Sequence, residues 1–271
     1  MEENNLPSKS SEKSSEPTAF AVLRFAFIIC LIASIVVSAV AQSLKQLQDE
    51  NKELDKQRNI LVAAGLMGEG ERVDKEKMTS LFSSIKVEAV NLDTGEVVDK
   101  IDVVSYDQRR ASRDVALGKA LSSDEDIALI KRRENIGLIY KLFDSSGNLK
   151  RFIIPIRGYG LWSTMYGFLA LSGDASTVEG ITFYDHGETP GLGGEIDNPN
   201  WKALWQGKSV YGNNGELAIR VVKGRAQQGS KSQIDGLSGA TLTSRGVDNM
   251  IHFWLQDKGY GNYIKKNILG R

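Results

Sequence analysis

The sequence has few of the side chains that carry out chemistry unaided. Its 271 residues include one cysteine, Cys30, and two histidines, His186 and His252. A single cysteine excludes an intramolecular disulfide framework. So few histidines and cysteines argue against a Cys–His nucleophile pair, a His-rich zinc site and the H-E-x-x-H motif. The 34 basic and 34 acidic residues cancel, so no excess of positive charge points to nucleic acid.

The sequence also lacks the common motifs of nucleotide binding. It has no G-x-x-x-x-G-K-[ST] phosphate loop, and no G-x-G-x-x-G follows an expected strand. The spacing of His186, Glu188 and Glu195 matches no metal-ligand pattern, so we expect no metal site. We also expect no catalytic side chain that acts alone. Either a bound cofactor carries the chemistry of this chain, or the chain has none.

One long hydrophobic run is present near the N-terminus. Residues 1–18 are polar and rich in Ser and Glu, as in a disordered tail. Residues 19–41 contain one charge, Arg24, and as a helix would span about 34 Å, enough to cross a bilayer core of roughly 30 Å. A cleaved signal peptide is the alternative, because residues 39–41 read Ala-Val-Ala. The uncharged run 25–41 exceeds a usual signal core of about 7–15 residues, so we favour a retained transmembrane helix.

Beyond this run, the pattern predicts an α+β protein in which a single transmembrane helix precedes a mixed α+β domain. We expect a helical stalk at 42–64, a connecting α+β region at 65–135 and a cofactor domain at 136–271. Glycine is concentrated in this last part, since 20 of the 27 glycines lie in residues 158–271. Glycine lets backbone approach a ligand closely, which suggests loops that grip a flat or phosphorylated group.

Hydrophobic periodicity and turn residues place the expected elements. The predicted helices are 75–85, 106–120 and 241–257; a hairpin is predicted at 87–98, and strands at 137–143, 152–156, 166–172, 178–184 and 217–222.

Two loops stand out against this background. One, E-T-P-G-L-G-G at residues 188–194, follows a predicted strand, and could be simply a glycine-rich connection. The other, D-G-L-S-G-A-T at residues 235–241, precedes the last predicted helix, and could be simply an N-terminal capping turn. Thr241 would then lie at a helix N-terminus, where free N–H groups and the helix dipole stabilise an anion.

These loops carry a family resemblance. Residues 235–241 resemble the flavinylation motif D-x-x-[ST]-G-A-T of bacterial FMN-binding domains, whose last threonine is esterified to the FMN phosphate by a dedicated flavin transferase. Residues 188–194 resemble the second signature of that family. With one N-terminal span, a stalk and N-P-N-W at residues 198–201, the chain is similar to the NqrC family, the FMN-binding subunits of Na+-translocating NADH:quinone oxidoreductases.

The resemblance implies roles for individual residues. Thr241 would carry FMN as a phosphoester, in a motif completed by Ser238, Gly239 and Ala240, while Asp235 would assist recognition or modification by the flavin transferase. Glu188, Thr189 and Leu192 would lie beside the isoalloxazine ring, and Leu161 and Trp162 would border the same pocket.

The resemblance also implies a function. The chain would relay electrons through its FMN to centres in other subunits of a complex that oxidises NADH, reduces quinone and exports Na+, with no NADH or quinone site of its own. It would lie in the bacterial inner membrane with its soluble domain on the periplasmic side. Two alternatives remain open: the homologous FMN-bearing subunit of an ion-translocating ferredoxin:NAD+ oxidoreductase, and a membrane-anchored binding or assembly module without redox activity.

Overall fold

The computed structural model describes residues 18–270, so the predicted tail lies outside the described part except for Thr18. The chain divides into two units, with the boundary between Lys52 and Glu53. The first unit contains the start of helix α1 (Ala19–Ala63). The 27 residues Ala19–Lys45 of this helix are long and apolar enough to cross a membrane. This stretch contains the whole predicted transmembrane segment.

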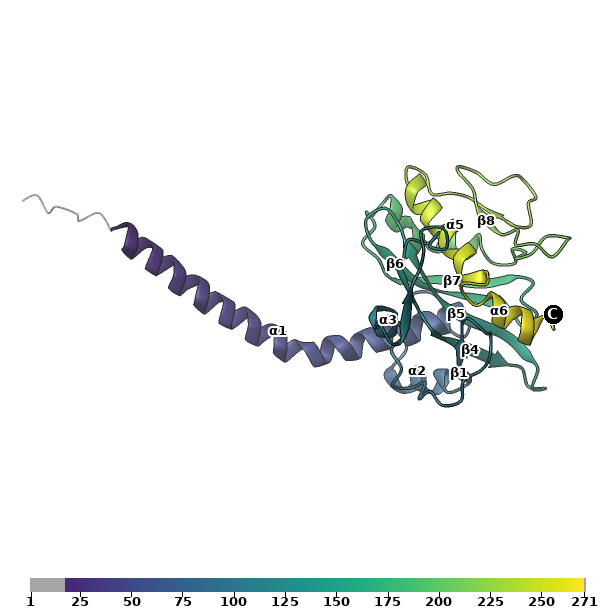
Figure 1. The fold of residues 1–271 in the computed structure, drawn as a ribbon, viewed down its shortest axis with the longest axis horizontal. Helices are drawn as coiled ribbons and strands as arrows, with labels where there is room; N and C mark the ends of the chain where they lie inside the picture. Colours follow the sequence, from purple (N-terminus) through teal and green to yellow (C-terminus); the bar gives the residue numbers. More distant parts are fainter. Residues whose placement is uncertain (1–17, 271) are drawn as a thin grey trace, which may run out of the picture. The chain divides into compact units, whose positions relative to one another are not determined.

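The second unit is built on a five-stranded antiparallel sheet (Figure 1). Its strand order is β1-β4-β5-β6-β7, so four of the five strands follow one another in the sequence. The strands are β1 (Ile85–Asn91), β4 (Ile136–Phe143), β5 (Leu149–Tyr159), β6 (Thr164–Ser172) and β7 (Val178–Asp185).

Shorter elements surround the sheet. The helices are α2 (Lys75–Phe82), α3 (Gln108–Arg113), α4 (Pro199–Ala203), α5 (Thr241–Leu255) and α6 (Gly261–Tyr263), with a 3-10 turn η1 (Gly193–Asp197) and a π-helical turn η2 (Ile264–Ile268). Two further strand pairs are β2 (Gly118–Ala120) with β3 (Arg132–Glu134), antiparallel, and β8 (Arg220–Val221) with β9 (Gln233–Ile234), parallel.

Local side chains define several element boundaries. Helix α2 begins after Asp74, whose carboxylate accepts a hydrogen bond from Lys77 N at 2.7 Å. The turn between β4 and β5 is ordered by Asp144, whose Oδ1 accepts from Ser146 N at 2.8 Å and Asn148 N at 2.9 Å. Such short polar residues stabilise turns and caps at the ends of apolar runs. The start of α2 at Lys75 agrees with the prediction, whereas β5 begins at Leu149, three residues before the predicted strand.

Both faces of the sheet are buried, by different parts of the chain. On β5, Phe152 and Ile154 belong to the core that includes α5, while Ile153 belongs to a second core on the other face. This alternation follows from the two-residue repeat of a strand. The second core contains the end of α1, with Leu61 and Ala63 almost fully buried. The compact unit therefore includes the second half of the predicted stalk and the predicted connecting region.

Four predicted elements are wrong in part. The predicted 75–85 helix ends at Phe82, and Ile85 is the first residue of β1. The 87–98 hairpin is present but short: Val90 and Val97 form one isolated bridge, and Val98 N donates to the Ala89 carbonyl, on the edge of β1 that does not pair with β4. The 106–120 helix ends at Arg113, since Asp114 Oδ1 accepts from Ala116 N and starts a turn into β2. The 217–222 strand shrinks to β8. The mixed α+β fold class after an apolar N-terminal helix is confirmed.

Candidate functional site

Three segments distant in sequence meet near the start of α5. They are the 159–163 turn after β5, the 186–194 loop after β7, and the residues around 239–246. A Cβ atom added to Gly239 would lie 3.1 Å from Leu192 Cδ2, and one added to Gly246 would lie 2.4 Å from the Tyr159 carbonyl oxygen. The two glycine-containing loops singled out in the sequence are therefore neighbours.

The carboxylate of Glu188 joins these three segments. Glu188 is 5% exposed. Its Oε1 accepts hydrogen bonds from the backbone N–H groups of Trp162 at 2.9 Å, Leu161 at 3.1 Å and Ser163 at 3.3 Å. Its Oε2 accepts from the Thr243 hydroxyl at 2.6 Å and from Leu161 N at 3.1 Å. One buried side chain thus binds the 159–163 turn to the first turn of α5.

Two glycines make room for this carboxylate. A Cβ atom on Gly160 would lie 2.6 Å from Glu188 Oε1. A Cβ atom on Gly193 would lie 2.5 Å from Thr243 Oγ1 and 2.8 Å from Glu188 Oε2. None of these three distances is compatible with ordinary packing, so any larger residue at Gly160 or Gly193 would displace the hydrogen bonds that Glu188 accepts.

The environment of Glu188 favours its ionised form. Burial raises the pKa of its carboxyl, but the hydrogen bonds from the Thr243 hydroxyl and from the backbone of Trp162, Leu161 and Ser163 outweigh burial. The pKa of Glu188 therefore lies below its usual value, and the side chain is a carboxylate at neutral pH.

The three hydroxyl groups at the start of α5 differ in their surroundings. Thr241, the first residue of the helix, is exposed. Thr243 is 1% exposed, and its hydroxyl donates to Glu188. Ser244 is 3% exposed; its hydroxyl donates to the Ala240 carbonyl at 3.0 Å and accepts from Leu237 N at 2.8 Å. Of these three, Thr241 is the one that an incoming group can reach.

The N-terminus of α5 is open toward solvent. The residue before Thr241 is Ala240, which offers no side-chain acceptor to the first N–H groups of the helix. Gly239 has φ +73°, a left-handed conformation that costs glycine nothing. Exposed apolar side chains lie on the neighbouring loops: Trp162 is 64% exposed, Leu192 45% and Leu161 40%. Free N–H groups beside exposed apolar groups suit a ligand with a phosphate and an aromatic ring.

The rest of the predicted motif orders the backbone. Asp235 Oδ1 accepts from Ala226 N at 2.7 Å, and the Asp235 carbonyl accepts from Trp201 Nε1 at 2.8 Å. Ser238 is exposed. In the other loop, the carbonyl of exposed Thr189 accepts from Leu192 N at 3.1 Å and from Gly194 N at 2.9 Å.

Comparison with known proteins identifies the family. Residues 160–256 match the model of the FMN-binding domain. The NqrC subunit of the Na(+)-translocating NADH-quinone reductase from Pseudomonas aeruginosa is 51% identical over 245 residues, which cover 89% of this chain and 93% of that protein. The same subunit from Yersinia pestis is 46% identical over 239 residues, covering 88% and 89%. The chain belongs to the NqrC family.

Solved structures agree with this assignment. The crystal structure of Shewanella oneidensis NqrC matches with a TM-score of 0.73 and 35% identity, covering 80% of this chain and 98% of that one. The structure of the same subunit from Parabacteroides distasonis matches with a TM-score of 0.62 and 27% identity, covering 82% and 96%. The resemblance read from the two loops is therefore confirmed. The NqrC family is favoured over the ferredoxin:NAD+ oxidoreductase subunit and over a module without redox activity.

The structure brings most of the predicted site residues of this NqrC family member into one region. Leu161, Trp162, Glu188, Leu192 and Gly239 are linked by the contacts given above. The sequence analysis missed Thr243 and the close approach at Gly160 and Gly193. No local pattern indicates these residues, because their shared partner Glu188 lies 55 residues from Thr243 in the chain.

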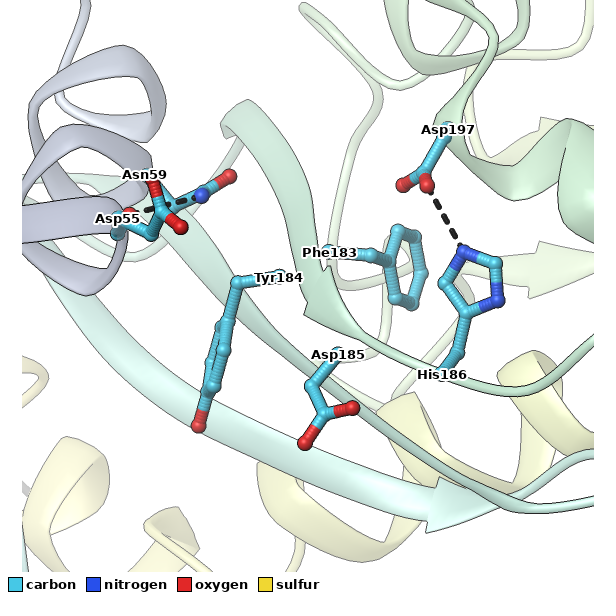
Figure 2. A pocket seen from close by; sticks show the side chains of 7 residues that line it. All are labelled: Asp55, Asn59, Phe183, Tyr184, Asp185, His186 and Asp197. Atoms are coloured by element: carbon cyan, nitrogen blue, oxygen red, sulfur yellow. Dashed lines mark hydrogen bonds and ion pairs between the residues drawn. The ribbon is translucent and has the colours of Figure 1, made fainter. Parts of the chain in front are cut away.

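A polar pocket of about 360 Å³ lies beside this region (Figure 2). It is lined by Asp55, Asn59, Phe183, Tyr184, Asp185, His186 and Asp197. In the neutral ring, His186 Nδ1 accepts from Glu188 N at 3.2 Å and Nε2–H donates to Asp197 Oδ2 at 2.8 Å; in the protonated ring the donation to Asp197 persists. Figure 2 shows the Asp197 carboxylate pointing at this ring. His186 therefore ties the start of the 186–194 loop to η1.

Proposed function

We propose that this chain is the electron-transfer subunit of a Na+-translocating NADH:quinone reductase, with FMN esterified through its phosphate to Thr241. It acts among other subunits of a complex that oxidises NADH, reduces quinone and exports Na+. One observation carries the proposed attachment: Thr241 is exposed at the start of α5, whereas the hydroxyls of Thr243 and Ser244 are buried and hydrogen-bonded.

The start of α5 suits a phosphate diester. The first N–H groups of the helix have no side-chain cap from Ala240, and the helix dipole favours negative charge at this end. The oxygens of a phosphoryl group on Thr241 would accept hydrogen bonds from those N–H groups and take the place of the missing cap. The backbone of Gly239 leaves the approach free of a Cβ atom.

The neighbouring loops suit the ring. FMN supplies electron-accepting and electron-donating chemistry that no side chain of this chain has. Trp162, Leu192 and Leu161 are exposed to the extent of 64%, 45% and 40%, and covering them with a flat ring would remove apolar surface from water. The apolar contacts would favour neutral over charged forms of the ring.

The motif also suits recognition by a maturation enzyme. We assign attachment to a flavin transferase that reads the segment Ser238–Thr241, in which Ser238, Gly239 and Thr241 are exposed. Asp235 contributes by ordering the preceding loop through its bond with Ala226 N. In this assignment Asp235 presents the segment and does not contact the ring.

For the membrane, we propose a retained span within Ala19–Lys45, with the unit Glu53–Arg271 on the periplasmic side of the inner membrane. The length and apolar character of the helix support the span. The side follows from the family and not from charge, because basic residues flank the helix on both sides.

Mass spectrometry tests the attachment. In the full chain produced with a flavin transferase, the peptide containing Thr241 gains the mass of an FMN phosphoester. Thr241→Ala loses this mass, and Thr243→Ala, the matched control two residues away, retains it. FMN mass on the Thr241→Ala protein would overturn the assignment.

Thiol labelling tests the membrane side. Ser145 lies in the exposed turn between β4 and β5. In a Cys30→Ser background, Ser145→Cys should react with an impermeant maleimide in cells whose outer membrane alone is permeable. Labelling that requires lysis of the inner membrane would reverse the proposed orientation.

A further inference from the structure

We propose that Glu188 is a positioning residue of the flavin site, whose carboxylate fixes the 161–163 turn against the first turn of α5. This inference rests on the proposed function, and it assigns Glu188 an action through the backbone of the turn and through Thr243. It differs from the expectation drawn from the family resemblance, in which Glu188 lies beside the ring as a contact residue.

The first argument is that the acceptor capacity of the carboxylate is used inside the chain. Three backbone N–H groups reach Oε1, and the Thr243 hydroxyl and Leu161 N reach Oε2. An ionised carboxylate offers about four lone-pair sites. These five contacts come from four donor groups, with Leu161 N shared between the two oxygens, so four donors occupy the four sites and Glu188 has no free acceptor site for a hydrogen-bond donor of the ring.

The second argument is that the 161–163 turn depends on this carboxylate. Trp162 is 64% exposed and Leu161 40% exposed, so side-chain burial does not anchor the turn. The N–H groups of three consecutive residues converge on Glu188 instead, whereas two other bonds of the turn, from Gly187 N to Ser163 Oγ at 2.6 Å and from Gly160 N to the Ser163 carbonyl at 2.8 Å, hold its end and not the N–H groups of Leu161 and Trp162. A turn held by charge-assisted hydrogen bonds from its backbone becomes mobile when the acceptor is removed.

The third argument is that the same carboxylate reaches the helix that begins with Thr241. Thr243 is buried two residues after the proposed attachment point, and its hydroxyl donates to Oε2 at 2.6 Å. Glu188 thereby sets the position of the turn bearing Trp162 relative to the helix bearing the phosphoryl group. Gly160 and Gly193 keep the space for this link open.

Hydrogen exchange of the full chain in detergent micelles, without flavin, tests the link directly. In Glu188→Ala, we expect the amides of Leu161 and Trp162 to exchange roughly ten- to a hundredfold faster, as for lost hydrogen bonds to a charged group. Glu188→Asp should also speed exchange, since a side chain one methylene shorter cannot reach both segments.

Glu188→Gln serves as the conservative rescue. Its amide oxygen can still accept from the turn, and its NH2 group can donate to Thr243 Oγ1, so exchange should stay within about threefold of wild type. Glu195→Ala, which removes a carboxylate seven residues further along the chain in η1, is the matched control and should leave these amides unchanged.

Flavin-loaded protein gives a second measurement. Acrylamide quenching of flavin fluorescence should be at least twofold stronger in Glu188→Ala than in Glu188→Gln, with each value corrected for the loaded fraction found by intact mass. Unchanged exchange in both Glu188→Ala and Glu188→Asp, or equal acceleration in Glu188→Gln, would overturn the positioning role. Absence of FMN from wild-type Thr241 would instead overturn the proposed function, since the exchange result is obtained without flavin.

Discussion

Removing the hydroxyl of Thr243 should destabilise the compact unit although Thr243 lies next to an exposed loop. In Thr243→Val the side chain keeps its shape and its β-branching, so helix propensity changes little. The carboxylate of Glu188 loses its 2.6 Å hydrogen bond and keeps only the 3.1 Å contact from Leu161 N at Oε2. Because Glu188 is 5% exposed, water cannot fully replace the lost donor.

The expected magnitude follows from the chemistry of this bond. A hydrogen bond to a charged group contributes about 1.5 to 3 kcal/mol. For a cooperative unit of 150 to 250 residues, each kcal/mol shifts Tm by roughly 2 to 4 °C. Thr243→Val should therefore lower Tm by about 3 to 12 °C at pH 7. The measurement is thermal unfolding of the full chain in detergent, recorded by near-UV circular dichroism.

The same substitution at Thr241 is the matched control. Thr241 is exposed, so Thr241→Val should change stability by less than about 0.5 kcal/mol. A double-mutant cycle then isolates the interaction: in a Glu188→Ala background, Thr243→Val should cost much less than in wild type. The reasoning fails if Thr243→Val melts within 1 °C of wild type, or if its cost is the same in both backgrounds.

Two further predictions concern other parts of the unit. The hydrogen bond with Asp197 raises the pKa of His186, while burial opposes it. Because the folded pKa exceeds the unfolded value of about 6.5, this pair stabilises the fold fully below that pH and loses its effect as pH rises through the folded pKa. Asp197→Asn should thus lower Tm more at pH 5.5 than at pH 8.5, and a larger loss at pH 8.5 would contradict the assignment. Leu61 at the end of α1 is 0% exposed, so Leu61→Ala should cost about 2 to 5 kcal/mol in urea unfolding, whereas Leu47→Ala, at 57% exposure, should not change the midpoint.

Local sequence patterns were sufficient for much of the fold. The strands β4, β5, β6 and β7 were predicted because short, nearly continuous apolar runs are bounded by turn residues such as Gly147. The helix starting at Thr241 was predicted because its apolar residues recur at the helical period. Apolar runs, turn residues and helical periodicity each depend on residues close together in the chain, so they can be recognised without the tertiary fold.

The regions predicted least well lack such local signals. The segment after β1 folds back at the predicted turn, but only as far as one bridge between Val90 and Val97. The long partner of β1 is β4, on its other edge, with Ile85 opposite Leu142, and the sequence did not indicate this pairing. Pairing across some 50 residues depends on which strands bury each other's apolar faces, and local propensity does not determine this choice.

The sequence by itself determined the family, the apolar N-terminal helix, the α+β class and the two loops of the candidate site, because these depend on short motifs and on periodicity. Only the tertiary structure decided what Glu188 does. Its partners, Trp162 and Thr243, lie 26 and 55 residues away in the chain, and they meet only when β7 and α5 are both folded. A buried carboxylate takes its role from the donors that surround it, and these are known only once the chain is folded.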